Sequence, residues 1–505
     1  MESTVPVAAP ILDVSPRVGD TGAELKRGAF LNTIALLTSN FIGVFTFLVA
    51  RLLGPAALGL FSVAWATTDV ISKIAVLGLD NSITTFIARS EAVGDRPRSR
   101  ALFHIAIAVV LVQSAVIAAL VIVVIHIFGD RLRLHRDMVS ALAVVLCALP
   151  GIGLYRVCTS VSRGMKVMKH DIYSRGMTEP IATTITFLVV LVLGFRKFAP
   201  ELAVIGGTAA SGVVAFALAA TLFRHVPAQA NSVSFRQETR QLLSYTAPIS
   251  VYQLLNALIF RLDVIMLGFF IGRAPGVTLA TVGVYGVVVD LANGLRKVNQ
   301  AFIPIFMPVV AEMTHTGDHE RAAATYGRLA QWMLWILLPL VAVMALAGPT
   351  ILLIFGPAFR QGGIWLGIVA VACATNAFVA LGETVIMVQR PRLNLLHSSI
   401  TCAVAIGANL WLIPRFGVMG AAFGILLPYL VQGILRYTAM RFVFKWRNSW
   451  SDFAPPVLAG IIALFPALVC LALLHGVAGQ ITAAAAFAIT FAIQWKYRAP
   501  SAPLV

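Results

Sequence analysis

The sequence predicts an all-α polytopic membrane protein with about 14 transmembrane helices. Of its 505 residues, 59% are hydrophobic and 12% are charged, whereas a soluble domain is about 25% charged. The mean hydropathy of +0.89 agrees with this class. A soluble chain this apolar would lack the polar side chains to cover its surface, and a bilayer removes that need.

Successive apolar runs are long enough to cross a bilayer, which takes ~20 residues of helix. In the first half we expect helices at 28–50, 59–87, 101–128, 138–158, 176–195 and 200–223. After a polar stretch we expect helices at 242–271, 278–311, 327–355, 362–388, 395–413 and 416–438. Two further runs follow at 453–474 and 478–495.

This order predicts two six-helix lobes in parallel repeat plus two C-terminal helices. Residues 52–73 and 266–297 share a pattern in which Leu-Gly ends one helix, a Gly followed by an aromatic residue begins the next, and an acidic residue lies inside it. Internal repeats are typical of transporters, whose substrates bind between the repeats. The expected domains are a cytoplasmic tail (1–27), an N-lobe (28–223), a cytoplasmic linker (224–241), a C-lobe (242–440), and a terminal helix pair with a cytoplasmic C-terminus (441–505).

The distribution of Lys and Arg predicts the orientation. With the N-terminus inside, the inside portions hold 27 of these residues and the outside loops hold 9. This bias predicts that both termini are cytoplasmic, although the outside loop 129–137 carries three arginines. The inside loops 159–178, 312–328 and 441–450 mix basic with apolar residues, so we expect them to lie along the anionic inner leaflet. They account for much of the net charge of +17 without nucleic acid binding.

Motifs of enzymes and metal sites are absent from the sequence. It contains no GxSxG, P-loop or HExxH motif, and its five cysteines are scattered without a CxxC pair. His315 and His319 are four residues apart, but Gly317 between them disfavours the helix that a zinc pair would need. We therefore expect no enzyme activity, no catalytic residue, no metal and no cofactor.

Charged residues inside the apolar runs are the candidates for function. Each costs about 2.5–3.5 kcal/mol at a helix centre, so it tends to face a cavity or a partner. The basic candidates, which would bind an anionic substrate group, are Lys73, Arg261, Arg296 and Lys297. The acidic candidates, which would bind a coupling proton or cation, are Asp69, Asp263, Asp290 and Glu179.

Two interpretations of these charges remain open. Structural salt bridges could pin helices together, as Asp69 and Lys73 would, because they lie four residues apart on one helical face. Alternatively, helices one, two, seven and eight enclose a hydrated, cationic cavity between the lobes. A pyrophosphate would suit such a cavity, because guanidinium groups match its oxygens.

The stretch ARLLGPAALGLFSVAWA (50–66) resembles the Wzx-like oligosaccharide flippases of the MOP superfamily. In that family the first helix ends in Arg-x-Leu-Gly-Pro, followed by a small-residue turn and Gly-Leu-Phe or Gly-Leu-Tyr. The start of the twelfth predicted helix, Gly-Val-Met-Gly-Ala-Ala (417–422), resembles the family's Gly-x-x-Gly-Ala-Ala. The two six-helix lobes and two terminal helices are similar over nearly the whole chain.

The resemblance implies a flippase in the inner membrane. It would move undecaprenyl-pyrophosphate-linked oligosaccharide repeat units outward by alternating access, for synthesis of exopolysaccharide, capsule or the O-antigen of lipopolysaccharide. Its partners would be that lipid-linked glycan, membrane lipid, and a polysaccharide polymerase and glycosyltransferases. The alternatives are a lipid II flippase, a cation-coupled multidrug (MATE-type) antiporter, or a membrane-embedded glycosyltransferase or polymerase, although the outside loops are short for the last class.

Overall fold

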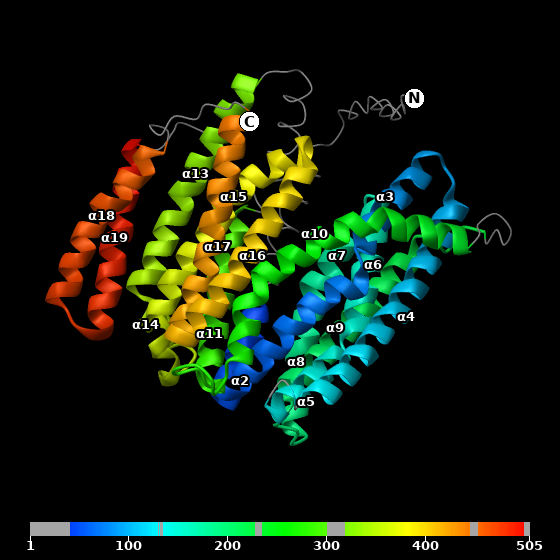
Figure 1. Cartoon of the computed structure of the whole chain (residues 1–505), viewed down its shortest axis with the longest axis horizontal. Helices are drawn as coiled ribbons and strands as arrows, with labels where there is room; N and C mark the ends of the chain where they lie inside the picture. The colour runs from blue at the N-terminus through cyan, green and yellow to red at the C-terminus, as the bar shows by residue number, and fades with distance from the viewer. Residues whose placement is uncertain are drawn as a thin grey trace.

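The computed structural model describes residues 41–129, 131, 135–227, 235–299, 319–444 and 453–498. Within them the chain forms helices and no strand (Figure 1). Twelve stretches of this part are long and apolar enough to cross a membrane. The predicted class, an all-α polytopic membrane protein, is therefore confirmed, whereas the number of fourteen helices stays a prediction.

The two counts differ at identifiable places. One candidate span, Gly43–Ala92, contains the end of the first predicted helix and all of the second. The predicted eighth helix (278–311) is described only as far as residue 299. The predicted tail (1–27), most of the first predicted helix, His315 and residues 312–318 and 445–450 of the predicted inside loops lie outside the described residues.

The first half of the chain forms a bundle on one side of the molecule (Figure 1). Its helices are α2 (Phe41–Val76), α3 (Leu79–Ala92), α4 (Arg96–Phe128), α5 (Arg136–Leu146), α6 (Leu149–Gly164), α7 (Lys169–Asp171), the π-helix η1 (Ile172–Thr178), α8 (Glu179–Val192) and α9 (Ala199–Thr221).

The second half forms a neighbouring bundle, followed by the terminal pair. Its helices are α10 (Phe235–Phe269), α11 (Leu279–Ala292), η2 (Asn293–Leu295), α13 (His319–Leu346), α14 (Gly348–Leu352), η3 (Pro357–Gly362), α15 (Gly363–Gln389), α16 (Pro391–Phe416), α17 (Val418–Thr438), η4 (Ala439–Val443), α18 (Ala454–Leu473) and α19 (Gly476–Arg498).

The predicted loop between the first two helices is almost absent. Helix α2 continues through residues 51–58 and is interrupted at Gly54 alone, where φ is 82° and ψ is 179°. A residue before proline avoids the helical region, glycine tolerates a positive φ, and Pro55 can begin a helix because it needs no N–H partner there. The Leu-Gly-Pro motif therefore forms a sharp kink between two directly joined helices.

Close contact between α2 and α11 joins the two halves. A Cβ atom on Gly283 would lie 1.8 Å from the carbonyl oxygen of Pro55, and one on Gly59 would lie 1.9 Å from that of Leu279. Only glycine allows the two backbones to approach this closely. Gly59 and Gly283 begin the Gly-Leu-Phe and Gly-Val-Tyr stretches, so the contact uses similar residues from both halves.

Helix α10 also contacts both halves, packing against α2, α3 and α4 as well as α16 and α17. It begins at Phe235, so the later residues of the predicted linker (224–241) are helical. Near its start, Glu238 accepts a hydrogen bond from Arg98 of α4 at 2.8 Å. In Figure 1, α10 runs from the first bundle to the second.

The expectation that 159–178 is a loop is wrong, because most of this segment is helical. Its first residues complete α6, and the span from Lys169 to Val192 is helical and apolar enough to cross a membrane. Hydropathy placed the start of this helix at residue 176, because Lys169, Asp171 and Arg175 lower the local average. Asp171 and Arg175 instead face a polar cavity, which allows charged residues at this depth.

The terminal pair α18 and α19 packs against α13 at one edge of the molecule (Figure 1). Trp335 of α13 is fully buried there and contacts the ring of Phe491 at 5.2 Å between centroids. Small residues of α18 and the stacked rings of Phe487 and Phe491 complete a second hydrophobic core. This pair therefore has its own packing, away from the contact between the two halves.

Candidate functional site

A polar cavity of about 710 Å³ lies where the two halves meet. Helices α2, α6, α7, α8 and α9 and the π-helix η1 form its wall in the first half. Arg261 of α10, Asp290 of α11 and Lys297 form its wall in the second half. We call this space the central cavity. It lies within a bundle of membrane-spanning helices, where polar groups are otherwise costly.

Both signs of charge line the central cavity. Among the described residues, its basic side chains are Lys73, Arg156, Arg175, Arg261 and Lys297. Its acidic side chains are Asp69, Asp171, Glu179 and Asp290. With five bases and four acids, the lining carries a small positive excess. The expected cationic cavity is thus more evenly charged than the basic candidates alone indicated.

Asp69 is the centre of the ion pairs in this cavity. Its Oδ2 accepts a hydrogen bond from Nε of Arg261 at 3.0 Å. Its Oδ1 lies 3.7 Å from Nζ of Lys73 and 3.6 Å from Nη2 of Arg156. The four side chains are 14–24% exposed, so water screens them less than it would on the surface. The predicted pair of Asp69 and Lys73 is therefore present, as part of a larger cluster.

The other acids come from different walls. Asp290 accepts a hydrogen bond from Thr46 of α2 at 3.4 Å. Asp171 and Glu179 flank the π-helix η1, which carries Arg175. A π-helix has wider turns than an α-helix and occurs often at functional sites. Here it brings three charged residues of one segment to the same cavity.

Most of the predicted site residues meet in this cavity, and two do not. Lys73, Arg261 and Lys297 line it, as do Asp69, Asp290 and Glu179. The two exceptions are Arg296 and Asp263, which pack inside the second half.

Arg296 and Asp263 have their own partners. Arg296 donates to the hydroxyl of Tyr429 at 2.6 Å and lies 4.0 Å from the ring centroid of Phe260. Asp263 is 1% exposed and accepts a hydrogen bond from Tyr285 at 2.6 Å. The structure thus brings these two residues to a neighbouring polar cluster.

Sequence reasoning did not select Arg156, Asp171 and Arg175, which also line the cavity. It counted the two arginines among inside charges, because they lie at the edge of apolar runs. One signal was present in the sequence: Asp171, Arg175 and Glu179 are spaced by four, as residues of one helical face are. Gly176, which disfavours a helix, and the basic residues before this segment, such as Lys166 and Lys169, obscured that pattern.

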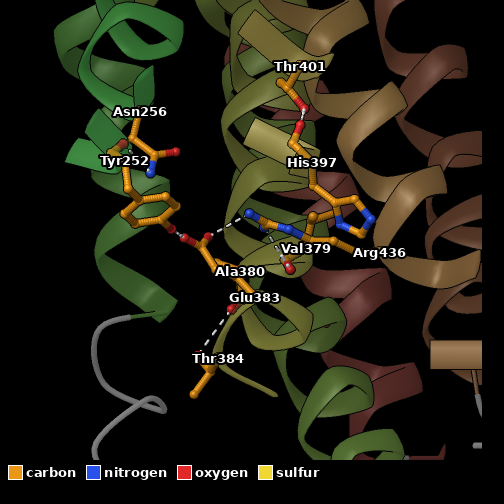
Figure 2. Close-up of polar contacts among 9 residues, drawn as sticks. All are labelled: Tyr252, Asn256, Val379, Ala380, Glu383, Thr384, His397, Thr401 and Arg436. Carbon is orange, nitrogen blue, oxygen red and sulfur yellow. Dashed lines mark hydrogen bonds and ion pairs between the residues drawn. The ribbon is translucent and has the colours of Figure 1, made fainter. Parts of the chain in front are cut away.

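A further polar cluster joins three helices of the second half. Glu383 of α15 lies between Tyr252 of α10 and Arg436 of α17, as Figure 2 shows. Tyr252 donates to one carboxylate oxygen, and Arg436 donates to the other at 2.8 Å. Arg436 is 2% exposed and also donates to the carbonyl oxygen of Val379 at 3.1 Å. This cluster fixes α10 to α15 and α17, away from the central cavity.

Comparison with known proteins finds a matching family model and a flippase of similar sequence. It matches the family model described as polysaccharide biosynthesis protein over residues 25–313, which is more than half of its length. The lipid II flippase MurJ of Bacillus subtilis (strain 168) is 20% identical over 368 residues. That match covers 66% of this chain and 66% of the flippase, just under two thirds of its length.

Solved structures show the same fold at low identity. A lipid II flippase MurJ in an inward closed conformation has a TM-score of 0.71 and 11% identity, covering 93% of this chain and 98% of that one. An inward-facing multidrug resistance MATE family transporter of the MOP superfamily has a TM-score of 0.66 and 15% identity, covering 81% and 94%. The chain therefore belongs to the polysaccharide biosynthesis protein family, and its fold is that of MOP-superfamily flippases and transporters.

Proposed function

We propose that this chain is a flippase for undecaprenyl-pyrophosphate-linked oligosaccharide repeat units. It would move them from the cytoplasmic to the outer leaflet of the inner membrane, for exopolysaccharide, capsule or O-antigen synthesis. The observation that carries the proposal is the central cavity, where basic side chains from both halves surround a space within the membrane-spanning bundle. The family of the chain supports a role in polysaccharide synthesis.

The cavity chemistry suits a substrate that is part anion and part sugar. Guanidinium and ammonium groups, among them Arg156, Arg261 and Lys73, would hold the pyrophosphate through charge-assisted hydrogen bonds. Carboxylates such as Glu179 and Asp290 would accept hydrogen bonds from sugar hydroxyls.

Alternating access would come from rocking of the two halves around this cavity. The contact between α2 and α11 and the crossing of α10 are the places where one half meets the other. Asp69 and Arg261 link α2 to α10 across the cavity, so the charged groups that would bind substrate also join the halves. Substrate binding and movement would therefore act on the same residues.

A coupling ion would use the acidic candidates. Glu179, Asp69 and Asp290 line the cavity, whereas Asp263 is buried beside Tyr285. We propose that a proton or cation binds at one of these carboxylates during the return step. Replacing each by its amide and measuring whether export still depends on the proton or sodium gradient would identify the site.

Lipid II is the second candidate substrate, because the chain is similar to a lipid II flippase over much of its length. Lipid II also combines a pyrophosphate with sugars, so the cavity chemistry alone does not separate the two. At 20% identity, this chain can differ from that flippase in the glycan that it carries.

Deletion of the gene in its native host, followed by lipid analysis of each leaflet, tests the proposal. We expect lipid-linked repeat units to accumulate on the cytoplasmic leaflet while peptidoglycan synthesis continues. Accumulation of lipid II would support the second candidate instead. Unchanged polysaccharide with lost drug resistance would contradict both and favour an antiporter.

A further inference from the structure

Asp69 holds three basic side chains together in the central cavity. They come from three helices: Lys73 from α2, Arg156 from α6 and Arg261 from α10. Three positive charges at this separation repel one another, and a shared carboxylate between them offsets that repulsion. One carboxylate supplies one negative charge, so the cluster keeps an excess of two.

The geometry around Asp69 leaves this cluster incompletely satisfied. Arg261 lies at hydrogen-bond distance, 3.0 Å, whereas Arg156 and Lys73 are 3.6 and 3.7 Å away. Two of the three bases are therefore near the carboxylate without donating to it. An anion with more oxygens and more charge would bind all three bases better than this carboxylate does.

We propose that Asp69 is an internal counter-ion, which a phosphate group of the substrate displaces from Arg261 and Arg156. This inference rests on the proposed function, because it takes the substrate to carry a pyrophosphate. Asp69 keeps the bases in place while the cavity is empty. A phosphate group of the substrate then binds Arg261 and Arg156 in place of Asp69. Asp69 pairs with them again when the substrate leaves.

The displacement has a mechanical consequence, because Arg261 and Asp69 lie on different helices of different halves. Their hydrogen bond ties α10 to α2. When a phosphate takes Asp69's place, this tie is exchanged for contacts to the substrate. Binding of the correct headgroup would thus loosen the contact between the halves, which an empty cavity keeps closed.

The test measures binding of radiolabelled inorganic pyrophosphate to the purified full chain in lipid nanodiscs. Asp69→Asn keeps the size of the side chain and removes its charge. If Asp69 competes with the anion, this variant binds pyrophosphate roughly tenfold more tightly than wild type, as removal of a nearby like charge implies. Export of repeat units in cells falls at the same time, because no carboxylate at position 69 returns to the bases when the substrate leaves.

Asp137→Asn on α5 is the matched control, since it removes the same charge from a carboxylate that lies outside the central cavity and pairs with Lys197 at 2.9 Å. We expect the pyrophosphate affinity of this variant to change less than about twofold, because its carboxylate lies away from the basic cluster and water screens it there. Should Asp69→Asn fail to insert stably, Asp69→Ser gives the same comparison.

Four outcomes decide the question. Tighter pyrophosphate binding by the Asp69 variant alone supports the counter-ion. Unchanged or weaker binding by that variant overturns it, as does an equal gain in Asp137→Asn, which would reflect total charge. Absence of pyrophosphate binding in every variant also overturns it. The proposed function is judged separately, because it fails only if deletion of the gene leaves lipid-linked repeat units correctly exported.

Discussion

Single arginines on α6 differ sharply in their surroundings, and this leads to a prediction. Arg156 lines the central cavity, whereas Arg163, two turns along the helix, donates to Ser160 of the same helix. We expect Arg156→Gln to weaken substrate binding by roughly ten- to a hundredfold, the loss of one charge-assisted hydrogen bond. Export in a deletion strain at matched protein levels measures the effect. Arg163→Gln should export as wild type does, and equal loss in both variants would contradict the assignment.

For single residues, the sequence identified the charged side chains inside apolar runs, but it did not show in which direction each side chain points. Lys73 and Asp69 stood out because they interrupt an apolar run, and both line the cavity. Arg296 and Lys297 were treated alike, yet neighbouring residues on a helix point about 100° apart, so one can line a cavity while the other packs elsewhere. Lys297 lines the cavity, and Arg296 contacts Tyr429 instead. Composition carries no information about helix rotation, which depends on packing.

Among the helices, the contact of α2 with α11 depends on the absence of side chains. A methyl group on Gly283 would lie 1.8 Å from the carbonyl oxygen of Pro55, so Gly283→Ala must push the helices apart. We expect a loss of about 1–3 kcal/mol in stability, measured as a lower unfolding temperature in detergent. Gly407→Ala on α16 is the control, because no atom lies within 4 Å of its added methyl group. Equal unfolding temperatures for the two variants would contradict this packing.

Glu383 connects α10 to α17 by accepting hydrogen bonds from Tyr252 and Arg436, so its replacement should lower the stability of the fold. Glu383→Gln would leave Arg436 buried without its ionic partner, which costs about 3 kcal/mol or more. Unfolding temperature and protein level in the membrane report this loss. The double variant Glu383→Gln with Arg436→Met removes the stranded charge, so we expect it to be more stable than the single variant. If the double variant is the less stable of the two, the cost has another origin.

Hydropathy predicted most spanning helices well and failed where a helix carries charges toward a cavity. The apolar runs of α4, α9 and α18 agree with the structure within a few residues. The start of the helix that contains η1 was missed, because an average over neighbours treats Asp171 and Arg175 as if they faced water. The direct joining at Gly54 was also missed, since a glycine-proline pair usually marks a loop.

For the whole molecule, the sequence indicated two halves but not how they meet. Their joining depends on residues far apart in the chain, such as Asp69 with Arg261 and Gly59 with Leu279. No local pattern specifies such pairs. The similarity between residues 52–73 and 266–297 did mark the right elements, because parts of both stretches pack together where α2 meets α11.

If the halves rock during transport, the contact between α2 and α11 must open and close. A Cβ atom on Gly286 would lie 3.0 Å from that of Ser62, slightly closer than the 3.5–4.5 Å of a disulfide. In a variant without the five native cysteines, Ser62→Cys with Gly286→Cys should therefore cross-link under mild oxidation. We expect cross-linking to stop export of lipid-linked repeat units and a reductant to restore it, while each single cysteine variant exports under both conditions. Continued export by fully cross-linked protein would show that this contact stays closed throughout the cycle, and would place the moving interface elsewhere.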